Sequence, residues 1–87
     1  MDVKEAVASA KAYVNEIFAP EKIENVGLEE FEFDRRHREW RITVGFSRPW
    51  QGLGALNTAT GIPRPRSYKI VTVSDSNGSV TSIRNRE

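Results

Sequence analysis

The only histidine of the chain, His37, lies between two carboxylates, Asp34 and Glu39, in an arginine-rich stretch. Imidazole and carboxylate groups are common general acids and bases, but this chemistry needs a positioned partner and usually a sheltered site. A solvated connection between two strands is expected to offer neither. One histidine, no cysteine and scattered carboxylates also give no metal-ligand spacing. We therefore predict no catalytic residue and no metal site.

Motifs for nucleophilic catalysis or phosphate binding are also missing from the sequence. Ser9, Ser47 and Ser67 have no visible base within a nucleophile motif. Residues 52–54 form a G-x-G, but neither the next glycine nor a helix start with a phosphate-binding lysine follows. We predict that the protein is not an enzyme and that it carries no cofactor.

The segment of residues 47–67 carries a second kind of chemistry, because it combines apolar and arginine side chains with three prolines and three glycines. A connection of this length in a compact domain is usually functional or disordered. Tryptophan and arginine are frequent anchors of protein interfaces. The segment either docks a partner or folds back as a lid over one end of a sheet. The residues that we predict to contact a protein partner are Arg48, Trp50, Leu53, Arg64 and Arg66.

Basic residues suggest an alternative function, which is nucleic-acid binding by a basic sheet face with aromatic side chains for stacking. Trp40 and Tyr68, however, are expected in the core, and no RNA-recognition signature is present. The pI of about 8.1 is also below the strongly basic range of such domains. The candidate residues are Arg35, Arg36, Arg38, Arg41, Arg64, Arg66, Lys69, Arg84 and Arg86.

Charge is distributed unevenly along the chain. Residues 1–34 carry three lysines against nine acidic residues, whereas residues 35–87 carry nine arginines and one lysine against three acidic residues. The two segments either neutralise each other as neighbours in one fold, or the basic one forms a surface for an anionic partner.

Length and composition predict one small domain of residues 1–87, of which 38% are hydrophobic and 29% are charged. No apolar run approaches the ~20 residues that a membrane span needs. The first residues lack a basic stretch followed by an apolar one, so we expect a cytoplasmic protein without a membrane partner.

Two kinds of periodicity indicate the elements that position these side chains. Apolar residues recur every three or four positions over residues 3–18, as on one face of a helix, with Asp2 and Glu5 as a capping box and Pro20 beyond the end. Alternation over residues 27–34 and 40–46 predicts two strands, and two more flank a turn at Asn77-Gly78. Because Val80 and Ile83 break the alternation, the last strand is expected to be an irregular edge.

The predicted fold is therefore α+β, with one N-terminal helix packed across a four-stranded antiparallel sheet and a long loop between strands 2 and 3. An exposed edge strand would allow a monomer or a weak homodimer. The residues expected in the core are Val7, Ala10, Val14, Ile17, Phe31, Phe33, Trp40, Ile42, Val44, Phe46, Tyr68 and Ile70.

The helix followed by strands that end in YKIVTVSDSNGSVTSI resembles PepSY-type domains and, more loosely, cystatin-like folds. The resemblance covers residues 3–18, 40–46 and 68–83, and the chain is also similar to small bacterial proteins without an assigned activity. It lacks the Gln-x-Val-x-Gly segment of cystatins. The resemblance implies a non-catalytic protein-interaction module, and no functional residue is carried over from it.

Overall fold

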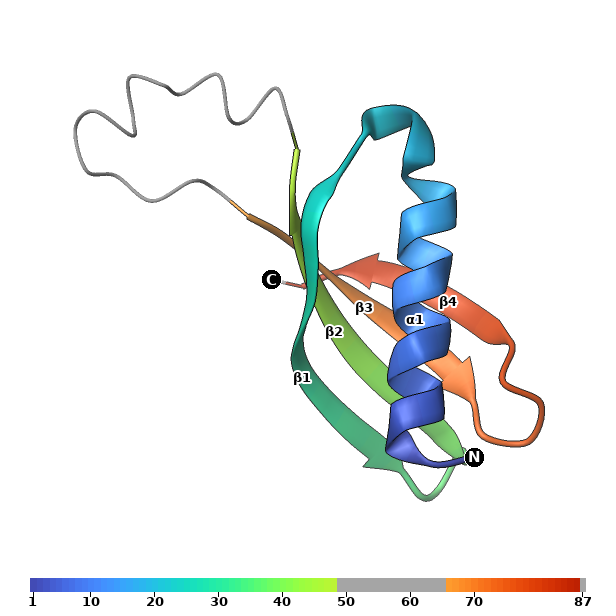
Figure 1. Ribbon diagram of the computed structural model, residues 1–87. Helices are drawn as coiled ribbons and strands as arrows, with labels where there is room; N and C mark the ends of the chain where they lie inside the picture. Colours follow the sequence, from blue (N-terminus) through green and yellow to red (C-terminus); the bar gives the residue numbers. More distant parts are fainter. Residues whose placement is uncertain (49–65, 87) are drawn as a thin grey trace.

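The computed structural model describes residues 1–48 and 66–86, which form one helix and a four-stranded sheet. The sheet is antiparallel throughout, in the order β1-β2-β3-β4, and the helix crosses one of its faces (Figure 1). This confirms the predicted α+β fold. The elements are α1 (Val3–Ile17), the short 3-10 helix η1 (Ala19–Glu21), β1 (Glu24–Asp34), β2 (Glu39–Ser47), β3 (Ser67–Ser74) and β4 (Val80–Asn85).

Helix α1 begins at the predicted capping box. The Asp2 carboxylate accepts a hydrogen bond from the Glu5 backbone N–H at 2.8 Å, and the Glu5 carboxylate accepts one from the Asp2 N–H at 3.2 Å. These bonds satisfy two donors that the first turn of a helix leaves without partners. The helix ends at Ile17, and the 3-10 helix η1, which contains Pro20, follows after Phe18.

Pairing between the strands fixes which side chains share a face. Ile42 of β2 lies opposite Phe31 of β1 and Val71 of β3, and Val71 lies opposite Ile83 of β4. Ile42 and Val71 are buried in one cluster with residues of α1, so these four positions belong to the face that the helix covers, which we call the helix face. The other side of the sheet is the open face. Arg41 and Glu32, a register pair, lie on the open face as predicted.

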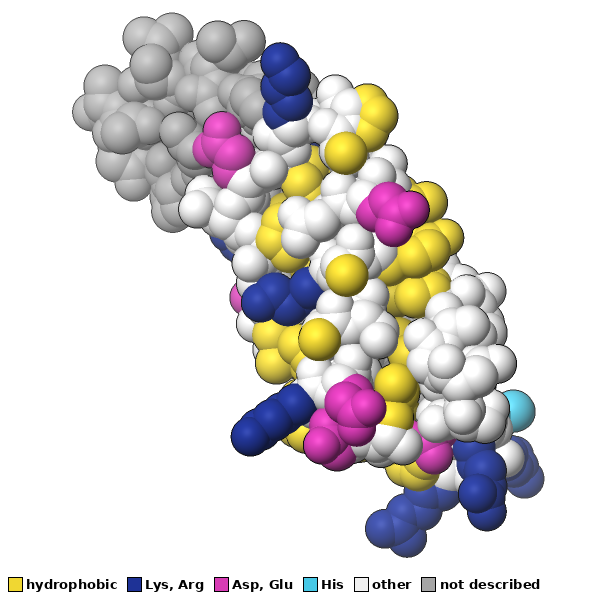
Figure 2. All heavy atoms as spheres, turned by 45° about the vertical axis from the view of Figure 1, so that its right-hand side comes forward, with side chains coloured by type: hydrophobic (Ala, Val, Ile, Leu, Met, Phe, Trp, Pro, Cys, Tyr) yellow, Lys and Arg dark blue, Asp and Glu magenta, His cyan; other side chains and the backbone are white. Residues whose placement is uncertain are grey.

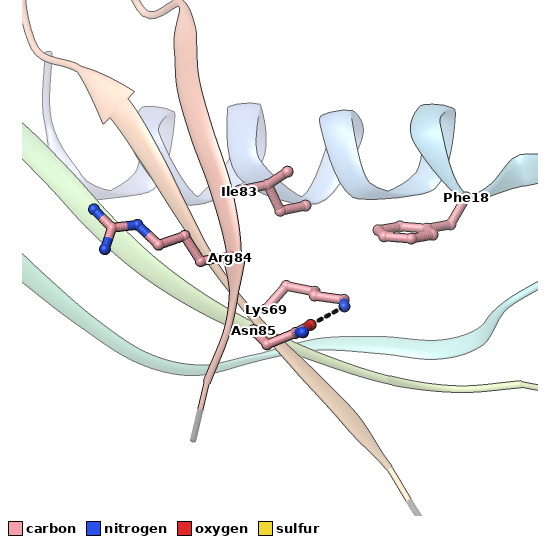
Figure 3. Close-up of a pocket in the computed structure, with 5 residues that line it drawn as sticks. All are labelled: Phe18, Lys69, Ile83, Arg84 and Asn85. Atoms are coloured by element: carbon pink, nitrogen blue, oxygen red, sulfur yellow. Dashed lines mark hydrogen bonds between the residues drawn. The ribbon is translucent and has the colours of Figure 1, made fainter.

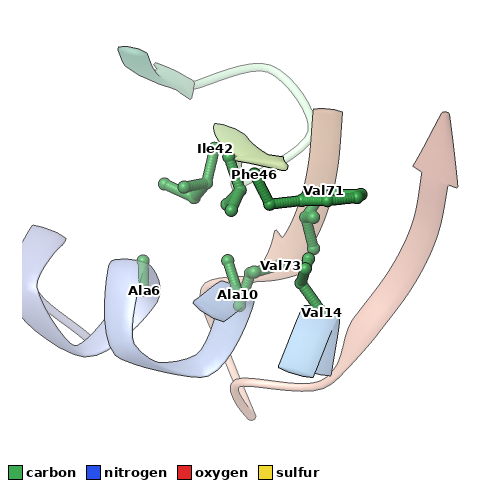
Figure 4. Close-up of a cluster of buried hydrophobic side chains, with 8 residues drawn as sticks. Ala6, Ala10, Val14, Ile42, Phe46, Val71 and Val73 are labelled. Atoms are coloured by element: carbon green, nitrogen blue, oxygen red, sulfur yellow. The ribbon is translucent and has the colours of Figure 1, made fainter. Parts of the chain in front are cut away.

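The core lies between α1 and the two central strands (Figure 4). Five predicted core residues are fully buried, namely Ala10, Val14, Ile42, Val44 and Phe46, and they are joined by Ala6, Val71 and Val73. Val7 and Trp40 pack against this cluster while remaining partly exposed.

Five predicted core residues lie elsewhere. Ile17, Phe31 and Phe33 are exposed by 47%, 51% and 37%. Ile17 lies in the last turn of the helix, and the two phenylalanines lie on the outer strand. Tyr68 and Ile70 are half-buried on the open face, because β3 turns Val71 and Val73 toward the helix. The prediction that Tyr68 and Ile70 lie on the buried face of β3 was therefore wrong.

Strand β4 is the irregular edge that the sequence indicated. The β3–β4 register shifts between Thr72 and Val73, so Thr81 has no partner in the ladder. Gly78 has the positive φ expected at the turn, 72°, whereas Asn77 does not share it. No helix among the described residues is long and apolar enough to cross a membrane.

Candidate binding surface

An apolar groove runs between α1 and β1 on the helix face. Its volume is about 360 Å³, and its helix wall carries Val3, Val7 and Ala8 while its strand wall carries Leu28 and Phe31. Lys4 and Lys11 also line the helix wall, where their methylene stems can extend the apolar surface and keep the ammonium groups in water. Hydrophobic side chains are visible along the flanks of the helix in Figure 2.

The groove exists because one helix is too narrow to cover four strands. A helix with side chains is about 10 to 12 Å wide, and strands lie about 4.8 Å apart, so α1 covers about two of them. The fully buried sheet residues beneath it are Ile42, Val44 and Phe46 of β2 and Val71 and Val73 of β3. Leu28 and Phe31 on β1 stay 40% and 51% exposed. Large apolar groups that remain this exposed are candidates for a binding surface.

Acidic side chains occupy the open face of β1. Glu30 and Glu32 lie opposite Thr43 and Arg41, and a register shift between Leu28 and Glu30 makes Glu29 an extra residue in the strand. Glu32 forms an ion pair with Arg41 at 2.8 Å. Among the described residues, the Glu30 side chain forms no ion pair or hydrogen bond, and Glu30 is exposed. The edge strand therefore has an apolar row on one face and an acidic row on the other.

Asp34 organises the hairpin between β1 and β2. Its carboxylate accepts hydrogen bonds from the backbone N–H groups of Arg36 and His37, and one of its oxygens, Oδ2, lies 2.9 Å from both His37 Nδ1 and Arg41 Nη1. These bonds, from His37 first and then Arg41, hold the pKa of Asp34 well below its usual range. The same carboxylate raises the pKa of His37 above 6.5. The expectation that His37 would lack a positioned partner was wrong.

The carboxylates and the imidazole of this hairpin also lie close to one another and to Arg41. Donor atoms of Asp34, His37 and Glu39 lie within 4.8 Å of one another, a proximity that the sequence spacing did not indicate. The Asp34 oxygen that would face a cation is already bonded to Arg41, and Glu39 lies 3.8 Å from the same guanidinium. His37 is 62% exposed, so the pair has no shelter from water. The ion pairs of Asp34 with His37 and Arg41 stabilise this turn.

Arg48, a predicted partner-binding residue, makes its described contacts inside the fold. Its Nε lies 2.6 Å from Glu21, its Nη1 donates to the Ser67 hydroxyl at 2.5 Å, and its guanidinium carbon lies 5.0 Å from the centre of the Phe46 ring. The side chain is only 12% exposed. These contacts tie Arg48 to η1, to the start of β3 and to the core, and its predicted role in docking stays a prediction.

The other predicted partner-binding residues divide into two groups. Arg66 Nη2 donates to the Asn25 carbonyl at 2.9 Å, so it links β3 to the start of β1. Trp50, Leu53 and Arg64 lie outside the described residues. Their predicted role in docking stays a prediction.

Basic side chains gather at opposite ends of the sheet. Arg35, Arg36 and Arg38 belong to the β1–β2 hairpin, and Figure 2 shows dark-blue side chains at this end beside the only histidine. At the other end, a hollow of about 300 Å³ is lined by Phe18, Ile83 and the bonded pair Lys69 and Asn85 (Figure 3). Arg41, which lies between these ends on the open face, is paired with Glu32 and Asp34. The acidic and basic segments thus neutralise each other in part.

Asp75, at the start of the β3–β4 turn, ties the hairpin end together. Its carboxylate accepts hydrogen bonds from the Trp40 indole at 3.1 Å and from the N-terminal ammonium at 3.3 Å. Both lower the pKa of Asp75, the indole more strongly. Beside it lies a hollow of about 390 Å³ that is lined by Phe33, Arg35 and Arg38. The carboxylate therefore serves to position the end of the sheet.

Comparison with known proteins found no matching family model, no similar curated protein and no similar solved structure. The resemblance to PepSY-type and cystatin-like domains therefore stays a prediction that rests on the pattern of helix and strands.

Proposed function

We propose that the protein is a non-catalytic interaction module that binds a protein partner along the groove between α1 and β1. The observation that supports this most directly is the exposure of Phe31 and Leu28 beside Val3 and Val7 in one apolar groove. Keeping a phenylalanine half in water wastes the free energy that its burial would contribute. A partner that covers the groove recovers it.

The sequence located the partner-binding surface in residues 47–67, and the groove provides a different one. Arg48 and Arg66 are engaged within the fold, whereas the side chains of the groove point to a space that α1 leaves uncovered. The two surfaces make different predictions, because a substitution at Phe31 affects only the groove.

Affinity purification from the native lysate tests the proposal, with nuclease present and with three versions of the protein. The wild type and Ile17→Ala should retain the same protein, and Phe31→Ala should lose it. Ile17 is a matched control because it is an apolar residue of similar exposure, 47%, outside the groove. Retention by Phe31→Ala would overturn the groove as the binding surface.

Nucleic-acid binding is the second candidate, and the hairpin of β1 and β2 favours it. Arg35, Arg36 and Arg38 are consecutive or nearly so, and all are exposed. No hydrogen bond or ion pair of the Arg35 or Arg36 side chain lies within the described part of the chain. Phosphate contacts weaken steeply as salt rises. Binding that disappears with nuclease and with Arg36→Gln, but persists in Phe31→Ala, would move the assignment to this surface.

A further inference from the structure

We infer that the partner binds as an extended segment that adds a fifth strand to the outer edge of β1, with apolar side chains on one face and basic side chains on the other. The inference rests on the proposed function and names the chemistry of the partner. It is carried by three observations, namely a free strand edge, an apolar groove beside it and an acidic row on its opposite face.

The edge itself supplies the first observation. Within residues 1–48 and 66–86, strand β1 pairs with β2 alone, and residues 30–34 pair with β2 without a register shift. The outer edge of such a strand presents backbone N–H and C=O groups that an added strand can pair. The shifts between Glu24 and Gly27 and between Leu28 and Glu30 confine the regular part of the edge to these residues.

The groove determines which kind of side chain the added strand places on the helix face. Successive side chains of a strand point to opposite faces, so every second residue of the segment would lie on the helix face next to Phe31 and below α1. Besides Lys4 and Lys11, the groove there is lined by the apolar side chains of Val3, Val7, Ala8, Leu28 and Phe31, so we infer that these positions of the segment are apolar.

The acidic row of β1 determines the charge of the side chains that the added strand places on the open face. Residues of the segment that point to the open face would lie across from Glu30 and Glu32. Opposite charges directly across two strands attract, and like charges repel. Glu30 has no described cation as a partner, so it can accept one from outside. The segment therefore alternates apolar and basic residues.

A second copy of the chain does not meet these requirements. A two-fold pairing of β1 with β1 would place the glutamates of one acidic row beside those of the other, which costs free energy. Strand β4 of another copy carries Arg84 on its open face, but its helix-face residues Val80 and Ile83 already pack against their own core. They are not free to fill the groove.

A fluorescence-anisotropy titration with synthetic probes tests the inference. The first probe is a labelled nine-residue peptide that alternates valine and arginine, and the second has glutamate in place of arginine. Wild-type protein should bind the first probe and not the second. Glu30→Arg should weaken binding of the valine-arginine peptide about five- to tenfold, whereas the matched reversal Glu16→Arg, at an exposed position of α1, should leave it unchanged.

Three results would overturn the inference. The first is equal binding of the two peptides by the wild-type protein. The second is equal affinity of Glu30→Arg and Glu16→Arg for the valine-arginine peptide. The third is unaltered binding of a valine-arginine peptide that is N-methylated on alternate residues and therefore cannot pair with a strand. Sedimentation of the free protein as an oligomer that the peptide dissociates would assign the edge to a second copy instead. These failures leave the Phe31→Ala purification result unaffected, so the groove and the added strand are tested separately.

Discussion

Strands β1 and β2 carry similar apolar alternation on the same face of the sheet, yet they have opposite environments. Ile42, Val44 and Phe46 of β2 are fully buried, whereas Phe31 and Phe33 of β1, which lie opposite Ile42 and Trp40, are 51% and 37% exposed. The difference arises from coverage, because the buried cluster under α1 is centred on β2 and β3, while Phe31 and Phe33 of β1 lie outside it. Alternation therefore decides the face on which a side chain lies, and packing decides whether it is buried.

Replacing one phenylalanine on each strand with alanine tests the difference between β1 and β2 most directly. Phe46→Ala should lower the free energy of unfolding by about 3–5 kcal/mol, since it removes a fully buried ring that lies 5.2 Å from Phe18. Phe31→Ala should cost only about 1 kcal/mol, because half of its ring is already in water.

Urea denaturation of the two variants measures both costs. Equal losses would mean that β1 is covered in solution, and the groove would then not be a free surface. A loss of 3 kcal/mol or more for Phe31→Ala alone would have the same meaning.

The substitution Arg48→Met tests whether Arg48 stabilises the fold or binds a partner. The substitution keeps much of the apolar volume but removes the ion pair with Glu21 and the hydrogen bond to Ser67. We expect a loss of about 1–2 kcal/mol in the free energy of unfolding, measured in urea. Unchanged stability together with loss of the purified partner would support the sequence-based assignment of Arg48 to the binding surface.

Asp2→Ala tests the helix that forms one wall of the groove. Losing the side-chain cap should cost about 1 kcal/mol, and Asp2→Asn, which keeps an acceptor for the Glu5 N–H, should cost less. Thermal unfolding followed by circular dichroism gives both values. If the two variants were equally destabilised, the capping box would not be what fixes the first turn.

The His37 and Asp34 pair should produce the smallest effect, visible as a pH dependence. Because the pKa of His37 is raised on folding, its contribution is fully present below pH 6.5 and is lost as the pH rises through the folded-state pKa. The pKa of Asp34 is lowered, so its contribution is present above about pH 3.8 and is lost as the pH falls through the lower folded value.

Urea titrations of wild type and His37→Gln at several pH values check the sign. The difference between the two proteins should be largest between pH 4.5 and 6 and should shrink above neutrality. A difference that grows with rising pH would contradict the charged pair.

The architecture was predictable because local signals agreed with the fold. The spacing of Ala10 and Val14, the capping box at Asp2 and the alternation from Ile42 to Phe46 each point to the element that forms. The wrong predictions concern whether a side chain is buried or exposed. Nothing local distinguishes Phe31 from Phe46, because the position of α1 over the sheet is decided by packing between distant segments.

The binding surface was predictable only in part. The sequence drew attention to Arg48, but its contacts with Glu21 and Ser67 join residues that are far apart in the sequence. The strict alternation of glutamate and phenylalanine at residues 30–33 predicts a half-buried strand, with the phenylalanines on the buried face. Its charged side chains fit equally well with an outer edge, since charge is a common feature of edge strands.

Backbone hydrogen exchange with and without the valine-arginine peptide tests the central claim most directly, because it compares the two edges of the sheet in one experiment. The account predicts that the peptide slows exchange at β1, within residues 30–34, and leaves β4 unchanged. Slower exchange at β4 or at the hairpin arginines, with none at β1, would contradict the assignment of the binding surface to the edge beside α1.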